Sequence, residues 1–100
     1  LWMGVPVVTV SGNRHAGRVG ASILGALDLG DLVALTSADY IAACTSLARD
    51  TKKLNSLRHS LRARLRESSL MDGVGFTRKM EEVLRQTWRS WCAKPAAGNL

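Results

Sequence analysis

The sequence is poor in cysteine, aromatic residues and proline. Its 100 residues include two cysteines, one phenylalanine, one tyrosine and two prolines. Cys44 and Cys92 fall on different predicted helices, and neither belongs to a CxxC or Cys/His ligand pattern. We therefore expect two reduced thiols in a reducing compartment, the cytoplasm, and no metal. His15 and His59 are also too isolated to predict a metal site.

Long apolar runs are missing too. No run approaches the roughly 20 residues that a membrane-spanning helix needs, and the apolar start lacks the basic region and cleavage site of a signal peptide.

One hundred residues make one small domain at most. Because Leu1 is not an initiator methionine and a strand is predicted almost at once, we expect the chain to be a piece of a longer polypeptide.

Acidic residues are absent between Thr51 and Arg66. The whole chain has 14 Lys and Arg against 8 Asp and Glu, a net charge of +6. The acid-free stretch carries the basic residues Lys52, Lys53, Arg58, Arg62, Arg64 and Arg66. This basic cluster could bind nucleic acid or an acidic surface, cover a negative neighbouring domain, or be the solvated face of a helix. The sequence leaves these alternatives open and favours the last two, which are structural, over a binding surface.

Residues 5–27 are the most organised segment and predict a strand, a tight turn and a helix. Residues 5–10 form a β-branched run typical of a buried strand. Residues 11–13 break it, and a helix is predicted from His15 to Leu27 with Gly20 and Ala21 allowing close packing on the strand. The apolar face of this helix is predicted from a spacing of four, at Val19, Ile23 and Leu27.

A second strand is predicted at residues 32–35, which a crossover helix would make parallel to the first. Three helices follow. A capping box at residues 36–39 opens the first, Asp50 caps the second, and a loop at residues 68–75 precedes the last, from Phe76 to Trp91. In the helix that Asp50 caps, the predicted apolar stripe is Leu54, Leu57, Leu61 and Leu65. In the last helix, the apolar stripe is predicted to be buried and consists of Phe76, Met80, Val83, Leu84, Trp88 and Trp91.

The predicted fold class is α/β. Two short parallel strands do not make a stable open sheet alone, so we predict the distal end of a doubly wound domain with a helical tail of three helices that wraps back onto it. Trp2 is expected to pack under the sheet.

The turn after the first strand is the chemical site that we predict. This glycine turn consists of Gly12, Asn13, Arg14 and His15. Ligands of parallel α/β sheets bind at the carboxyl ends of strands, and helix N-termini hold anions. Arg14 could pair with a phosphate, and His15 could bond a phosphate or a sugar hydroxyl. The glycines match neither the dinucleotide fingerprint nor a Walker loop, so a ligand-facing and a structural turn both stay open.

Arg18 lies one helical turn further on. It could reach the same site or fix the turn by bonding its carbonyl groups, and we favour the structural role. No nucleophile–base pair occurs at motif spacing, so the residues alone predict no reaction.

Residues 1–35 resemble the C-terminal catalytic lobe of the O-linked N-acetylglucosamine transferase-like and SPINDLY proteins. The family pattern is roughly LW-x-G-x-P-V-V-T-x-P-G-x-x-x-A-S-R-V-x-A-S-x-L. The matching residues are Leu1, Trp2, Gly4, Pro6, Val7, Val8, Thr9, Gly12, Ala16, Arg18, Val19, Ala21, Ser22 and Leu24. Ser11 replaces a common proline and Gly17 replaces the serine before Arg18. A weaker likeness continues through the predicted helices.

The resemblance implies a GT-B glycosyltransferase with two Rossmann-like lobes. Residues 1–36 would end the nucleotide-sugar-binding lobe, residues 37–93 would be C-terminal helices packing on it, and residues 94–100 a disordered tail. The glycine turn would face the donor sugar, supported by Arg18. The family uses no metal or cofactor in its chemistry; its donor, typically UDP-N-acetylglucosamine, is a substrate.

The resemblance also implies partners. These are the rest of the catalytic region and upstream tetratricopeptide repeats in the same chain, and a protein acceptor, with no membrane. We expect a bacterial-type, cytoplasmic enzyme. Because the family's donor motif and catalytic residues lie outside these 100 residues, we expect no catalysis by the isolated chain. The alternative from another class is a small basic helical nucleic-acid-binding module that uses Arg58, Arg62, Arg64 and Arg66.

Overall fold

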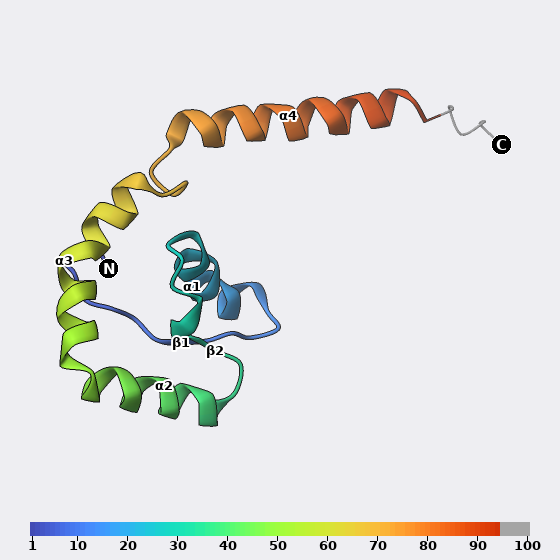
Figure 1. Ribbon diagram of the computed structural model, residues 1–100. Coiled ribbons are helices and arrows are strands. Elements are labelled where there is room, and N and C mark those ends of the chain that lie inside the picture. Colours follow the sequence, from blue (N-terminus) through green and yellow to red (C-terminus); the bar gives the residue numbers. More distant parts are fainter. Residues whose placement is uncertain (95–100) are drawn as a thin grey trace.

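The computed structural model describes residues 1–94, so the predicted disordered tail falls almost wholly outside the described residues. The described chain has a strand–helix–strand unit followed by three helices, in the order predicted (Figure 1). The elements are β1 (Thr9–Val10), α1 (His15–Ala26), the 3-10 helix η1 (Gly30–Leu32), β2 (Val33–Ala34), α2 (Ser37–Arg49), α3 (Thr51–Glu67) and α4 (Gly73–Cys92).

β1 and β2 are parallel neighbours, as the crossover predicts. Thr9 pairs with Val33 and Val10 with Ala34, and the Ser11 N–H extends the ladder by donating to the Ala34 carbonyl at 2.8 Å. The predicted buried strand at residues 5–10 is wrong in length and burial. Only its last two residues pair, because β2 itself is that short among the described residues. Val5 and Val7 are exposed, whereas Val8 is half-buried against the leucine core.

α1 packs on the sheet through Gly20. A Cβ added to this residue would lie 2.9 Å from the Thr9 Oγ1, which confirms the predicted close approach. The predicted apolar face is partly confirmed. Leu27 is buried and Ile23 packs against the core as predicted, but Val19 is 42% exposed and Leu24, which was not predicted, is buried. The helix ends where Asp28 adopts a φ of 55° and the Leu29 N–H returns to the Leu24 carbonyl, a Schellman arrangement.

Both predicted helix caps are confirmed. The Thr36 hydroxyl oxygen accepts from the Asp39 N–H at 3.1 Å at the start of α2, and the Asp50 carboxylate accepts from the Lys53 N–H at 2.9 Å at the start of α3. Each cap satisfies a backbone donor that has no partner within its helix.

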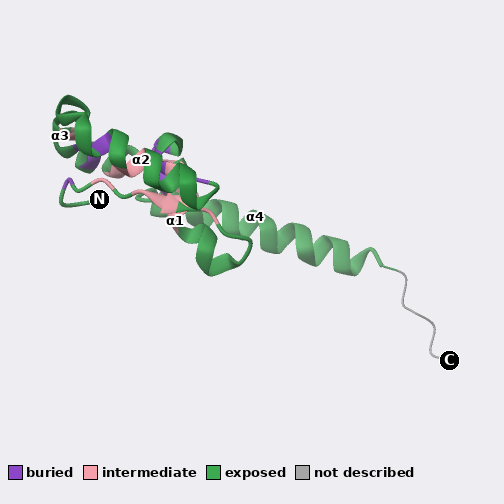
Figure 2. Ribbon diagram, turned by 90° about the horizontal axis from the view of Figure 1, so that it is seen from below, coloured by how far each residue is buried: buried purple, intermediate pink, exposed green. Residues whose placement is uncertain are grey.

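The core is a leucine cluster between α1, η1, α2 and α3 (Figure 2). α3 contributes its predicted stripe, with Leu57 and Leu61 buried. Because burial of one leucine side chain is worth about 1.5–3 kcal/mol, this cluster holds the helices on the strand–helix–strand unit. Its buried members are Leu24, Leu27, Leu29, Leu32, Leu47, Leu57 and Leu61.

α4 stands away from this core (Figure 1). It begins at Gly73, earlier than predicted, because the Asp72 carboxylate caps it by accepting from the Gly75 N–H at 2.8 Å. None of its residues is buried; Trp88 and Trp91 stack on each other with ring centroids 5.4 Å apart, and both remain exposed. The predicted burial of its apolar stripe and its wrapping back are therefore wrong within the described chain.

The overall dimensions of the chain reflect the position of α4 away from the core. The radius of gyration is 19.6 Å, against about 13 Å for a compact domain of this length. Within residues 1–94, no other element buries the apolar face of α4. No helix within residues 1–94 has the length and apolarity needed to cross a membrane.

Candidate functional site

The glycine turn joins the carboxyl end of β1 to the start of α1. The structure brings its four predicted residues together as one exposed loop. The Gly12 N–H donates to the Gly17 carbonyl at 2.9 Å and folds the loop back on the first turn of α1. The two glycine backbones touch, since a Cβ added to Gly17 would lie 3.1 Å from the Gly12 Cα. Gly17 therefore tightens this loop, in place of the serine of the resembled pattern.

The start of α1 is electrically positive and has no side-chain cap. Arg14 is the N-cap residue, with an extended backbone, and its side chain makes no capping hydrogen bond. The first turn contains no acidic residue. The helix dipole and the first N–H groups therefore add to the charges of Arg14 and Arg18, which suits an anion such as a phosphate.

Arg18 and His15 line one hollow of about 530 Å³ on α1, together with Val19, Ser22 and Ile23. Within residues 1–94, the turn is closed by the backbone bond between Gly12 and Gly17 and not by a bond from Arg18. The supporting role of Arg18 stays a prediction. Arg18 is left exposed beside His15, on the side of the helix that the hollow occupies.

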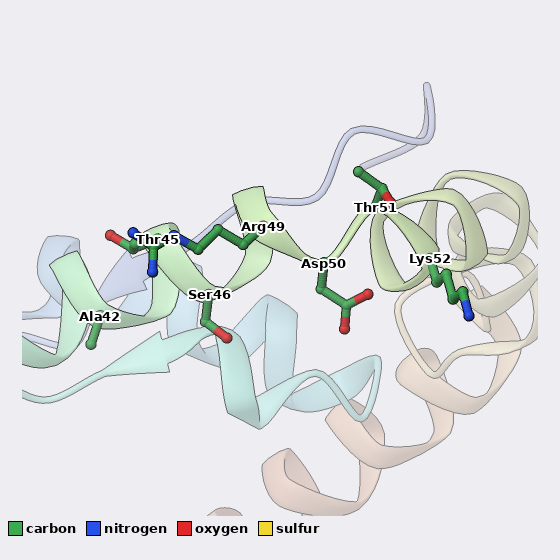
Figure 3. A pocket seen from close by; sticks show the side chains of 7 residues that line it. All are labelled: Ala42, Thr45, Ser46, Arg49, Asp50, Thr51 and Lys52. Atoms are coloured by element: carbon green, nitrogen blue, oxygen red, sulfur yellow. The ribbon is translucent and has the colours of Figure 1, made fainter.

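A larger hollow, of about 750 Å³, lies at the corner between α2 and α3 (Figure 3). Sequence reasoning did not single it out, and its polar groups serve the helices. Asp50 caps α3, and the Thr45 hydroxyl donates to the Ile41 carbonyl at 2.7 Å. Its lining residues are Ala42, Thr45, Ser46, Arg49, Asp50, Thr51 and Lys52. This hollow does not include the glycine turn.

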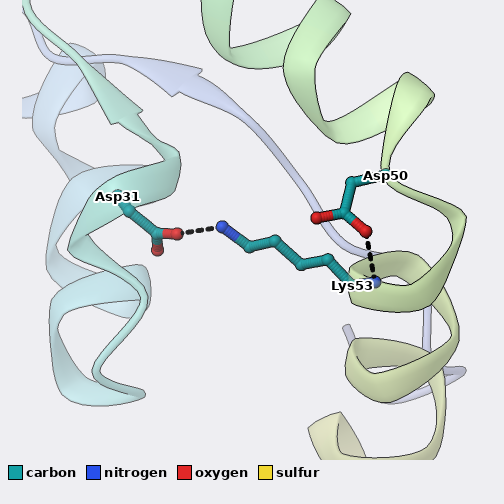
Figure 4. Close-up of polar contacts among 3 residues, drawn as sticks. All are labelled: Asp31, Asp50 and Lys53. Carbon is teal, nitrogen blue, oxygen red and sulfur yellow. Dashed lines mark hydrogen bonds and ion pairs between the residues drawn. The ribbon is translucent and has the colours of Figure 1, made fainter.

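The basic cluster does not form one free surface. The Lys53 ammonium pairs with the Asp31 carboxylate (Figure 4). Arg62 and Arg66 both lie over the ring of Trp2, at 5.3 and 5.7 Å from its centroid. Trp2 was predicted to pack under the sheet; it lies on α3 because these two cations attract the electron-rich face of its ring.

Among residues 1–94, no group of three or more His, Cys, Asp or Glu side chains could hold a metal ion.

Tyr40 has a shifted pKa. The Cys44 side chain, one turn along α2, raises the pKa of the phenol through a hydrogen bond and through the repulsion between the two anions.

The amino-acid sequence places the chain in a known family. A family model described as glycosyl transferase family 41 matches residues 1–80. The chain belongs to glycosyl transferase family 41. The resemblance noted for residues 1–35 is thereby confirmed, and it extends through the described helices.

Individual relatives agree with this membership. The probable UDP-N-acetylglucosamine–peptide N-acetylglucosaminyltransferase SPINDLY of Solanum lycopersicum is 44% identical over 92% of this chain and 10% of its own length. A UDP-N-acetylglucosamine–peptide N-acetylglucosaminyltransferase of Caenorhabditis elegans is 33% identical over 91% of this chain and 8% of its own. This family 41 chain thus spans about a tenth of the curated relatives that it matches.

A solved structure shows the fold. A mutant of the Thermobaculum terrenum O-GlcNAc transferase matches with a TM-score of 0.81 and 43% identity, over 91% of this chain and 18% of that one. The family 41 chain is therefore an α/β fragment of a GT-B lobe, with two short parallel strands and three further helices. The division at residues 36 and 93 and the donor-facing role of the glycine turn stay predictions.

Proposed function

We propose that this chain is the C-terminal part of a glycosyltransferase that moves N-acetylglucosamine from UDP-N-acetylglucosamine to serine or threonine hydroxyls of proteins. The observation that carries the proposal is the match to the O-GlcNAc transferase structure at 43% identity. The names of the relatives point to the same donor and to a peptide acceptor. Nothing in the comparisons favours the nucleic-acid-binding alternative.

The glycine turn is proposed to face the donor. Its support is the uncapped, acid-free start of α1 at the carboxyl end of β1, where an anionic diphosphate would meet N–H groups and the Arg14 guanidinium. His15 would bond a phosphate or a sugar hydroxyl, with Arg18 beside it. These groups supply positive charge from the protein itself, so the proposal includes no metal and no cofactor.

The proposal includes the rest of the protein. The exposed apolar stripe of α4 and the unpaired residues before β1 need a surface to pack on, which the remaining catalytic region would provide. Upstream tetratricopeptide repeats, a protein acceptor and a cytoplasmic location follow from the family resemblance. Bacterial origin stays a prediction, since most of the curated relatives are plant proteins.

A chimera tests the function. Residues 1–92 replace the matching segment of the Thermobaculum terrenum enzyme, and transfer of labelled N-acetylglucosamine from its UDP donor to a protein acceptor is measured. We expect the chimera to transfer sugar, and Arg14→Ala and His15→Ala to raise the donor KM about tenfold each, the effect of losing one charged hydrogen bond. Gln86→Ala, within α4 and outside the glycine turn, is the control and should leave the donor KM unchanged.

A folded chimera that neither binds UDP nor transfers sugar would overturn the proposal. The isolated chain provides a second check, because we expect it to transfer nothing without the absent donor motif and catalytic residues. Binding of a DNA duplex by the isolated chain, lost steeply as salt is added, would favour the nucleic-acid alternative instead.

A further inference from the structure

The acid-free run of α3 leaves two arginines without a carboxylate. Within residues 1–94, neither Arg62 nor Arg66 has an acidic side chain within ion-pair distance. The two guanidinium groups lie one turn apart on the same face of α3, so they repel each other. Some other group must favour this arrangement.

That group is Trp2. Both guanidinium carbons lie within 6 Å of its ring centroid, at 5.3 and 5.7 Å. The Arg62 Nε also donates to the Trp2 carbonyl at 3.1 Å. One residue thus offers both arginines an electron-rich ring and offers Arg62 a hydrogen-bond acceptor. The contact of Arg62 is therefore specific for arginine, whereas that of Arg66 depends on its positive charge over the ring.

The contact continues one turn earlier on α3. Gly4 is buried, has a φ of 78° and lies against the backbone of Arg58, where an added Cβ would meet the Arg58 carbonyl oxygen at 2.6 Å. The Gly4 N–H donates to the Leu1 carbonyl at 2.9 Å and closes a turn. Residues 1–4 therefore dock along three successive turns of α3, and we name them the N-terminal arm.

The arm leads directly into β1 and the glycine turn. Between the arm and β1, residues 5–8 pair with no strand of the described chain, and β1 itself is two residues long. Such a short parallel ladder stabilises its position weakly. α1, α2 and β2 hold β1 along its length. The arm on α3 adds a contact at the segment that leads into β1, and the Gly12–Gly17 bond adds one at the segment that leaves it.

We propose that Arg62 and Arg66 are positioning residues that clamp Trp2 on α3 and thereby hold β1 and the glycine turn in place. The clamp accounts for Arg62 and Arg66 of the basic cluster, to which the proposed function gives no role. Its effect on donor binding rests on that proposed function; its effect on the turn does not.

Amide hydrogen exchange on the 100-residue chain tests the clamp without any donor. The Ser11 and Gly12 amides are informative because each is hydrogen-bonded at the turn, to Ala34 and Gly17. In Arg62→Gln and in Arg66→Gln we expect both amides to exchange about five to ten times faster, together with a shift of the Trp2 indole resonance. Arg66→Lys keeps a cation over the ring and should restore most of the protection.

Two further variants keep the result interpretable. Arg64→Gln removes the same charge from α3 without touching the arm and should leave both amides unchanged. Trp2→Leu removes the aromatic ring of the clamp and should reproduce the faster amide exchange of the two arginine variants. Unchanged exchange in Arg62→Gln, Arg66→Gln and Trp2→Leu, or an equal effect of Arg64→Gln, would overturn the proposal.

The same variants in the chimera separate the clamp from the proposed function. If the turn faces the donor, Arg62→Gln should raise the donor KM about threefold to tenfold while kcat changes less. Faster exchange at the turn with an unchanged KM would still support the clamp, and would show instead that the turn does not contact the donor.

Discussion

The Thr9 side chain lies directly over the bare Cα of Gly20. A Cβ on Gly20 would come 2.9 Å from the Thr9 Oγ1 and 3.3 Å from its Cβ. We expect Gly20→Ala to destabilise the chain by about 1 kcal/mol, because overpacking of about 1–3 kcal/mol exceeds the helix propensity gain of about 1 kcal/mol. Urea unfolding followed by circular dichroism measures the difference.

Gly25 is the matched control in the same helix. An added Cβ there meets nothing within 4 Å, so Gly25→Ala should stabilise the chain by about 0.5–1 kcal/mol. Thr9→Ala should remove most of the penalty of Gly20→Ala, since it removes the Oγ1. A stabilising Gly20→Ala in the native background would show that α1 does not pack this closely on β1.

Asp28 ends α1 in the left-handed region, with a φ of 55°. This conformation costs a residue with a Cβ about 1–2 kcal/mol, and glycine nothing. The greater conformational entropy of glycine in the unfolded chain offsets part of this gain. We therefore expect Asp28→Gly to stabilise the chain by about 0.5 kcal/mol. Asp28→Ala should destabilise it by about 1 kcal/mol, because aspartate adopts the left-handed region more readily than alanine does. Thermal unfolding ranks the stability of the native chain and the two variants. An alanine variant as stable as the glycine variant would contradict the left-handed conformation of residue 28.

Local patterns predicted much of the fold. Thr36 and Asp50 were identified as caps because their short side chains precede periodic apolar segments, and such bonds form within a few residues. The stripe of α3 was identified because Leu57 and Leu61 recur at helical spacing. The glycine turn was found because it interrupts a β-branched run. Each of these features depends on near neighbours in the sequence.

The errors concern contacts between distant segments. The periodicity of α4 predicts an apolar face but not what covers it, and within residues 1–94 that face stays exposed. Trp2 could not be placed on α3, because no local pattern links residue 2 to Arg62 and Arg66. Pairing across such separations is decided by the tertiary fold, which also shifted the buried face of α1 to Leu24.

The Lys53–Asp31 ion pair joins α3 to the strand–helix–strand unit (Figure 4). Its side chains are 44% and 53% exposed, so solvent screens the attraction. We expect a double-mutant cycle with Lys53→Gln and Asp31→Asn to give a coupling of about 0.5 kcal/mol that vanishes in 1 M salt. A coupling of several kcal/mol that salt does not reduce would show that the pair is buried in solution.

Tyr40 and Cys44 form the remaining testable pair. Because the Cys44 side chain raises the pKa of the Tyr40 phenol, the phenol should stay neutral at a pH where an ordinary tyrosine, of pKa about 10, is half ionised. The chain contains one tyrosine, so the absorbance of tyrosinate follows this group alone. Cys44→Ala should return the midpoint to the ordinary value, since it removes both the hydrogen bond and the thiolate charge. Cys92→Ala, at the end of α4, should leave the midpoint where it is. Equal midpoints in the native chain and in Cys44→Ala would mean that the two side chains do not meet on α2.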